Sequence, residues 1–153
     1  MALVACGGAG TGGAGAGGAA QSGAKNVPFA EVATSQQSNR EDLAIVVATN
    51  NATQSIARTF NASPPPADRA LVAAFQGEQR TGGFSIHITK IELSGDQLLV
   101  RAAFTRPAAD AMVIQVITSP AHVVSVLKSD IAGARVAVLL DATGAEMARS
   151  DIT

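Results

Sequence analysis

The chain has 153 residues, which is the length of one ordinary domain and too short for two of typical size. A formal net charge of −1 and a pI of about 6.1 argue against a general binder of nucleic acid or acidic lipid, because such surfaces need clustered lysine and arginine. Trp and Tyr are absent, so the chain lacks side chains that are favoured at interface hot spots. No apolar run approaches the roughly 20 residues of a membrane-spanning helix.

The first 24 residues differ in composition from the rest of the chain. They hold nine of the 15 glycines, eight alanines and no charged side chain. We therefore expect residues 1–24 to be a flexible Gly/Ala-rich tether and residues 26–153 to be a single globular domain. Cys6 is the only cysteine, which excludes an internal disulfide bond and a cysteine-based metal site.

The sequence Leu-Val-Ala-Cys at residues 3–6 resembles a bacterial lipobox, in which small side chains precede a cysteine that becomes the lipidated N-terminus. We therefore expect a lipid anchor on Cys6 that holds the domain in the cell envelope, on the outer side of a bacterial membrane. A signal peptide needs an apolar stretch of about 7–15 residues, whereas only residues 1–5 precede Cys6. A low-complexity leader with an unmodified cysteine therefore stays open as the alternative.

The first half of the domain contains two strand patterns and one helix pattern. Apolar residues within 28–32, followed by a polar turn, predict a short strand, and the apolar run at 43–48 predicts a buried strand. Residues 51–60 predict a short helix that Thr49 or Asn50 caps.

The second half is a succession of strand patterns separated by turn signals. These patterns cover residues 69–76, 84–93, 98–104, 112–118, 123–128 and 135–141, with a weak terminal strand after them. The alternation changes phase near Thr89 and Lys90, which predicts a β-bulge. The predicted fold class is α+β: a mainly antiparallel curved sheet or open barrel of about seven to eight strands, with one short helix over one face.

Two histidines are the first candidates for chemistry. His87 alternates with the apolar residues of its strand, so we expect it to face solvent or a second layer. His122 follows Ser-Pro-Ala and is expected at the edge of a loop. A metal or proton-transfer site would require the two imidazoles to meet near a carboxylate, and their spacing gives no reason for that. No serine lies in a nucleophile-elbow sequence, so we expect no catalytic residue, cofactor or metal.

Residues 77–83 (Gly-Glu-Gln-Arg-Thr-Gly-Gly) form a glycine-rich segment that raises the question of phosphate binding. The segment lacks the Lys-Ser/Thr pair of a P-loop, and a strand pattern follows it rather than a helix. Glycines that serve a sharp turn or a close backbone approach are therefore the better interpretation.

Two segments carry a resemblance to a known family. Residues 81–88 read Thr-Gly-Gly-Phe-Ser-Ile-His-Ile, and residues 115–124 read Gln-Val-Ile-Thr-Ser-Pro-Ala-His-Val-Val. In this order they resemble the C-terminal domain of the PrcB-type protease-complex subunit family, with a specific match over about residues 70–128. The motif residues are Gly82, Gly83, Phe84, Ser119, Pro120 and His122. Ala121 stands where family members commonly carry an aromatic residue.

The resemblance implies a non-catalytic extracytoplasmic lipoprotein that binds a protein partner, as an accessory or stabilising subunit of a surface protease complex. The near-neutral composition, rather than the resemblance, leads us to expect no nucleic-acid partner. Two other functions stay open. One is a small-ligand-binding or hydrolytic domain that uses His87 and His122. The other is a protease inhibitor that presents the stiff loop of Pro64, Pro65 and Pro66.

Overall fold

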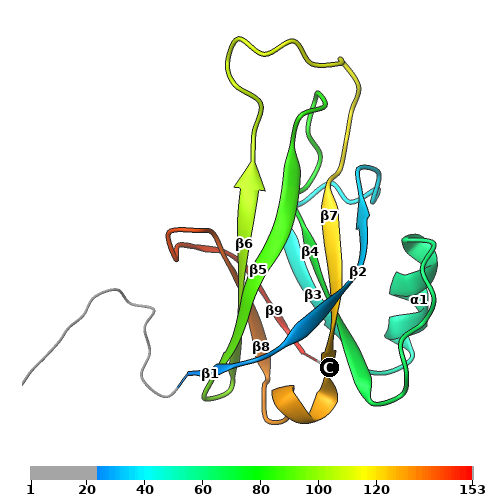
Figure 1. Ribbon diagram of the computed structural model, residues 1–153, viewed down its shortest axis with the longest axis vertical. Coiled ribbons are helices and arrows are strands. Elements are labelled where there is room, and N and C mark those ends of the chain that lie inside the picture. Colours follow the sequence, from blue (N-terminus) through cyan, green and yellow to red (C-terminus); the bar gives the residue numbers. More distant parts are fainter. Residues whose placement is uncertain (1–23, 153) are drawn as a thin grey trace, which may run out of the picture.

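A computed structural model describes residues 24–152 of the chain (Figure 1). The predictions for Cys6 and for the tether up to residue 23 therefore lie outside the described residues. Within the described part, no helix is long and apolar enough to cross a membrane.

The described residues form nine strands, one α-helix and one short 3-10 helix. In chain order they are β1 (Lys25–Asn26), β2 (Phe29–Ser35), β3 (Ala44–Ala48), α1 (Ala52–Thr59), β4 (Arg69–Phe75), β5 (Ser85–Ser94), β6 (Gln97–Thr105), β7 (Ala121–Leu127), η1 (Lys128–Ile131), β8 (Val136–Leu140) and β9 (Glu146–Asp151). The predicted bulge is confirmed, because the pairing of β5 with β6 shifts register between Ile88 and Lys90.

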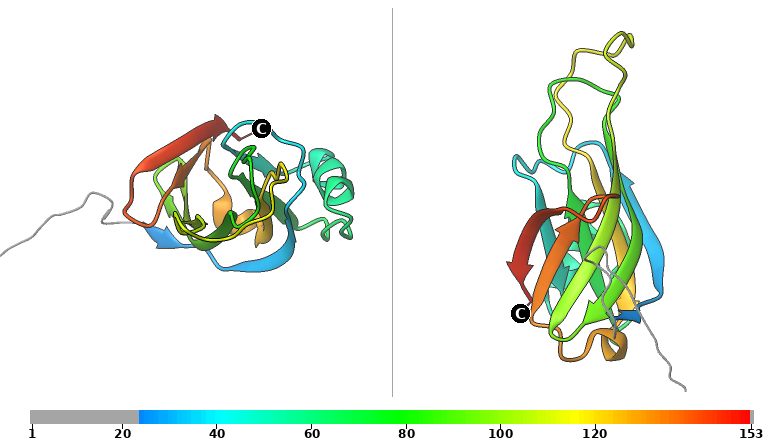
Figure 2. Two further views of the ribbon diagram at one scale, coloured as in Figure 1. Left: turned by 90° about the horizontal axis from the view of Figure 1, so that it is seen from above. Right: turned by 90° about the vertical axis from the view of Figure 1, so that its left-hand side faces the viewer.

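The strands form two curved sheets that face each other. The five-stranded sheet has the order β1-β5-β6-β8-β9, and the four-stranded sheet has the order β2-β7-β4-β3. Every neighbouring pair is antiparallel except β6 and β8, which run parallel. Seen from above, the sheets curve around a common interior and α1 lies outside it (Figure 2). The predicted mainly antiparallel, open arrangement with one helix is confirmed, although the described strands number nine rather than seven or eight.

The main core lies between the two sheets. Alternate residues of the longer strands point into it, among them Val72 on β4, Ile88 on β5, Val100 on β6 and Val124 on β7, and all four are 0–1 % exposed. Burying a side chain of this size stabilises the folded chain by roughly 1.5–3 kcal/mol. The large number of such residues explains why the apolar alternation was a reliable predictor of these strands.

Helix α1 covers the outer face of β3 and β4. Ile56 and Phe60 lie one turn apart and pack with the buried Ala57 and Leu71 in a second apolar cluster. The predicted caps, Thr49 or Asn50, are both wrong: Asn51 is the N-cap, and its side chain makes no capping hydrogen bond.

The predicted strand at residues 112–118 does not form. These residues belong to a long connection between β6 and β7 that rises beyond the sheets beside the loop of residues 77–84 (Figure 1). The segment has strong β-propensity, yet its backbone pairs with the neighbouring loop at only two points: Thr118 forms a β-bridge with Gln79, and Ile114 accepts the N–H of Gly82. Strand propensity produces a strand only where a second strand is available for pairing. We call residues 77–84 and 106–118 together the lobe.

Candidate functional site

Three side chains from three strands meet at the seam between the two sheets. Glu31 lies on β2, His87 on β5 and His122 on β7, and their potential ligand atoms all lie within 4.8 Å of one another. The strands β2 and β7 belong to the four-stranded sheet, whereas β5 belongs to the five-stranded sheet. The cluster therefore connects the sheets.

The edge of β5 explains why a side chain is needed here. The short strand β1 pairs with β5 only at Glu92 and Leu93. Residues 85–88 of β5, on the other side of the bulge, therefore have no strand paired along this edge. The buried N–H of Ile88 donates instead to Nδ1 of His122, at 2.8 Å. A buried N–H without an acceptor would cost about 1–3 kcal/mol. The imidazole of His122 thus replaces a missing strand.

The cluster has a buried member and two exposed members. His122 is 0 % exposed, whereas the side chains of His87 and Glu31 are 56 % and 62 % exposed. The two imidazole rings are stacked, with centroids 4.4 Å apart and planes 14° apart. Oε1 of Glu31 lies 3.2 Å from Nε2 of His122 and 3.4 Å from Nε2 of His87. One carboxylate oxygen therefore faces both rings.

The hydrogen bond from Ile88 fixes the tautomer of His122. Because Nδ1 accepts a hydrogen bond, it carries no hydrogen, and the single hydrogen of the neutral ring must lie on Nε2. That N–H faces Glu31, although its contact is not aligned as a hydrogen bond. Burial, and then the neighbouring His87, lower the pKa of His122, and these effects outweigh the opposing effect of Glu31. His122 is therefore neutral at pH 7.

The residue types of this cluster are those that bind Zn²⁺, but the geometry of His122 does not fit a metal. A metal would need a free lone pair on Nε2, with the hydrogen moved to Nδ1. There it would face the N–H of Ile88, whereas metal-bound histidines donate from the second nitrogen to an acceptor. The nearly parallel rings also direct their nitrogen lone pairs side by side rather than toward one point.

The structure agrees with the position predicted for His87 and revises the one predicted for His122. His87 is exposed, as predicted. The loop-edge position predicted for His122 is wrong, because this residue lies in β7 and is fully buried. The two rings meet because β5 and β7 lie next to each other across the seam, which their spacing in the sequence does not reveal. Sequence reasoning missed Glu31. The available signal was an isolated carboxylate in an otherwise uncharged strand pattern.

The double glycine of the motif brings the two loops of the lobe into contact. The N–H of Gly82 donates to the carbonyl oxygen of Ile114, at 3.0 Å. A Cβ on Gly82 would lie 2.9 Å from the Ile114 side chain, and one on Gly83, at φ +91°, would lie 2.9 Å from Pro107. These glycines serve close approach and a left-handed turn. Phe84 follows them and is half-buried at the start of β5.

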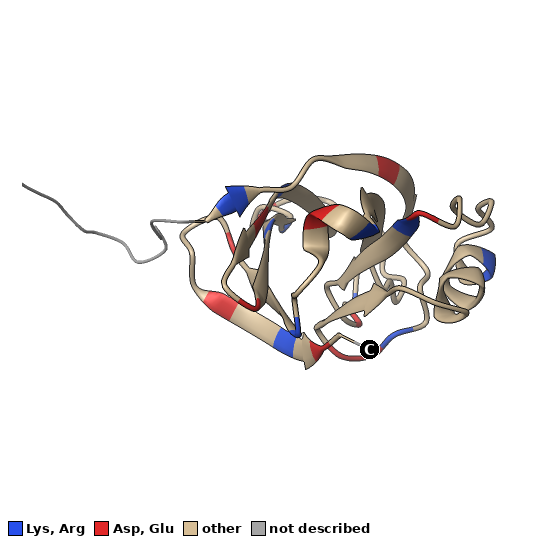
Figure 3. Ribbon diagram, turned by 90° about the horizontal axis from the view of Figure 1, so that it is seen from below, with Lys and Arg blue, Asp and Glu red and all other residues tan. Residues whose placement is uncertain are grey.

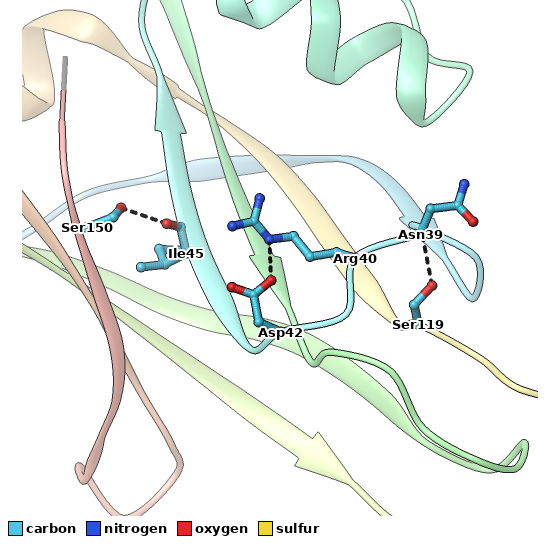
Figure 4. A network of polar contacts seen from close by, with 6 residues as sticks. All are labelled: Asn39, Arg40, Asp42, Ile45, Ser119 and Ser150. Carbon is cyan, nitrogen blue, oxygen red and sulfur yellow. Dashed lines mark hydrogen bonds and ion pairs between the residues drawn. The ribbon is translucent and has the colours of Figure 1, made fainter.

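Ser119 and Pro120 fasten the lobe to its surroundings. The hydroxyl of Ser119 accepts the N–H of Asn39 at 2.9 Å, in the polar network of Figure 4. The backbone of Ser119 also exchanges hydrogen bonds with residues 36 and 38, and the carbonyl oxygen of Pro120 accepts the N–H of Gln76. Among the described residues no peptide bond is cis, so the bond between Ser119 and Pro120 is trans.

The proline loop joins α1 to β4. Pro64 and Pro66 are exposed, whereas Pro65 is half-buried. This loop is accessible, and the inhibitor function remains a prediction.

The fold and the cluster define a β-rich domain of two curved sheets that a buried histidine fastens together. Residues 70–126 match the family described as PrcB C-terminal, which supports the resemblance found in the sequence. The matched segment contains β5, β6 and most of β4 and β7, and therefore both histidines but not Glu31. Comparison with curated proteins and with solved structures finds no significant match.

Proposed function

We propose that this domain is a non-catalytic binding domain of an extracytoplasmic lipoprotein, acting as an accessory or stabilising subunit of a surface protease complex. The family match supports an association with a protease complex. The lipobox-like sequence at Cys6 supports a lipid anchor on the outer side of a bacterial membrane.

The observation that carries the proposal is the apolar surface of the lobe. Met112 is 100 % exposed, Ile114 70 %, Ile117 57 % and Val116 42 %. Single exposed apolar residues are ordinary, but four within six residues mark a contact surface. The segment has the composition of a strand, so a partner strand added beside it would bury these side chains and satisfy its backbone.

The distribution of charge fits a protein partner better than nucleic acid. On the face seen in Figure 3, lysine and arginine are interspersed with aspartate and glutamate rather than gathered in one patch. A nucleic-acid surface would gather its cations along one groove or stripe.

The lobe can be tested by capture of a partner. Met112→Lys combined with Ile117→Lys places two cations on exposed positions, so the fold should persist while partner binding is lost. The wild-type chain, crosslinked in membranes of the organism that makes it, should recover one defined protease-complex component. We expect the double variant to lose at least tenfold of that recovery. Met147→Lys is the matched control, because Met147 is an exposed apolar residue on β9, outside the lobe.

Equal recovery by the double variant would show that the lobe is not the contact surface. Recovery of the bait alone by the wild type would contradict the binding function itself.

The anchor can be tested separately by mass spectrometry of the native N-terminus. We expect a mature chain that begins at Cys6 and carries acyl chains, and we expect Cys6→Ser to release the protein from membranes. A native chain with an unmodified Cys6 thiol would contradict the proposed location.

The convergence of His87 and His122 favours a second candidate, a small-ligand-binding or hydrolytic domain. Among residues 24–152, however, the polar contacts of the two rings are with Glu31 and the Ile88 amide, the rings stack on each other, and no serine or aspartate hydrogen-bonds to either ring. Hydrolysis of small esters by the wild type, abolished in His87→Gln, would favour this candidate over the binding domain.

A further inference from the structure

Glu31, His87 and His122, which we call the seam cluster, lie next to the base of the lobe. Strand β5 begins at Ser85, immediately after the first loop of the lobe, and β7 begins at Ala121, shortly after the second. His87 and His122 thus stand near the start of the two strands that support the lobe. The hydrogen bond from Ile88 to His122 is a direct connection between these strands.

We propose that Glu31, His87 and His122 form an acid-sensitive clasp that holds β5 against β7 and releases it when His122 gains a proton. The binding of this proton needs no partner protein, so the proposal stands apart from the proposed function. An effect of this release on partner binding at the lobe would rest on the proposed function.

Protonation of His122 is incompatible with its hydrogen bond from Ile88, because both need the same atom, Nδ1. A protonated imidazole carries hydrogen on both nitrogens, so the hydrogen on Nδ1 would face the N–H of Ile88 only 2.8 Å away. The incoming proton can therefore be accommodated only if this hydrogen bond breaks. The same contact that satisfies the edge of β5 at neutral pH is lost in acid.

The ionisable groups that face His122 act in opposite directions. Glu31 on β2 favours the protonated ring, whereas His87 on β5, once charged, opposes it. On β4 the residue paired with His122 is Ala74, which does not ionise. Burial adds to the effect of His87, and together they lower the pKa of His122 in the closed clasp.

Amide hydrogen exchange at Ile88, measured by NMR on the full chain, tests the clasp. An exposed histidine has a pKa of about 6.5, so the open form gains protons below that pH while the closed form does not. After correction for intrinsic rates, the opening constant at Ile88 should rise about 30-fold between pH 7.5 and pH 5.0. The amide of Leu139, buried on β8 away from the seam, exchanges through global unfolding, so its opening constant should stay below that of Ile88 at both pH values.

Two variants separate titration from packing. His122→Asn places an amide oxygen near the position of Nδ1 but cannot titrate, so its Ile88 exchange should be flat over this range. His87→Gln keeps His122 and should keep the pH dependence. Equal pH dependence in His122→Asn and wild type would overturn the proposal. Equal opening constants at Ile88 and Leu139 would do the same, because Ile88 would then exchange only through global unfolding.

The ¹⁵N chemical shifts of the His122 ring report its tautomer in the wild type, so this test does not depend on whether a variant folds. We expect an Nε2–H tautomer at pH 7.5. An Nδ1–H tautomer would overturn the clasp. Stoichiometric shifts of both histidine rings on addition of Zn²⁺ would do the same and assign the cluster to metal binding.

Discussion

His122 performs a task that usually belongs to a backbone carbonyl. Its ring accepts the N–H of Ile88 at an edge that no strand covers, and this position leaves the ring fully buried. Burial disfavours the imidazolium more than the nearby Glu31 carboxylate favours it, so the residue is held neutral. A polar residue in a buried strand is explained here by a specific acceptor requirement.

Gly77 is a second residue whose identity follows from the backbone around it. It has φ +86°, and an added Cβ would lie 3.0 Å from the carbonyl carbon of Asp42 and from the amide nitrogen of Leu43. Gly95 also has a positive φ, at +61°, but an added Cβ there would meet nothing within 4 Å. A side chain at Gly77 would therefore meet both backbone strain and steric contact, whereas one at Gly95 would meet backbone strain alone.

We predict that Gly77→Ala lowers the free energy of unfolding by about 2–4 kcal/mol, because strain and backbone displacement add. The matched variant Gly95→Ala should lose only about 1 kcal/mol, from strain alone. Urea denaturation of both variants measures the difference. Equal losses would show that the backbone around Asp42 yields freely to a Cβ.

At the scale of elements, sequence patterns predicted strands where burial on a common core enforced the alternation. Residues 84–93 illustrate this, since even the phase change at the bulge was visible in the order of apolar residues. The segment at residues 112–118 was misread because its apolar residues face solvent in the lobe. Propensity does not report whether a neighbouring strand exists.

The seam cluster could not be predicted for a related reason. Which side chains meet across two sheets depends on strand order and register, and Glu31 and His87 lie on strands that do not pair with each other. The exposure of His87 followed from alternation within its own strand. The contact of His87 with His122 could not be predicted in this way, because it depends on the edge of β5 that the two-residue strand β1 leaves open.

At the scale of the whole molecule, the neutral state of His122 links stability to pH. Its pKa is lowered in the folded chain, so between that pKa and about 6.5 the unfolded chain binds more protons. Stability is therefore fully present above pH 6.5 and falls as the pH drops below it. Asp141 and Glu146 have lowered pKa values as well, and their contributions are lost only at more acidic pH.

We predict that the free energy of unfolding decreases from pH 7 to pH 5 with a slope of up to about 1.4 kcal/mol per pH unit. Urea titrations at several pH values measure this slope. In His122→Asn the slope over the same range should be markedly smaller. A wild-type stability that rises on acidification would contradict the assigned state of His122.

The strand order also decides how this domain can be cut from its chain. A fragment of residues 70–126 would keep the pairs β4–β7 and β5–β6 but lose β2, β3 and β8, which flank them. Both pairs would then present long apolar strands with open edges, the usual template for aggregation. Because β6 pairs in parallel with β8, the missing neighbour cannot be restored by a local hairpin. A fragment expressed to obtain this domain should therefore begin at residue 25 or earlier and end at residue 152 or later.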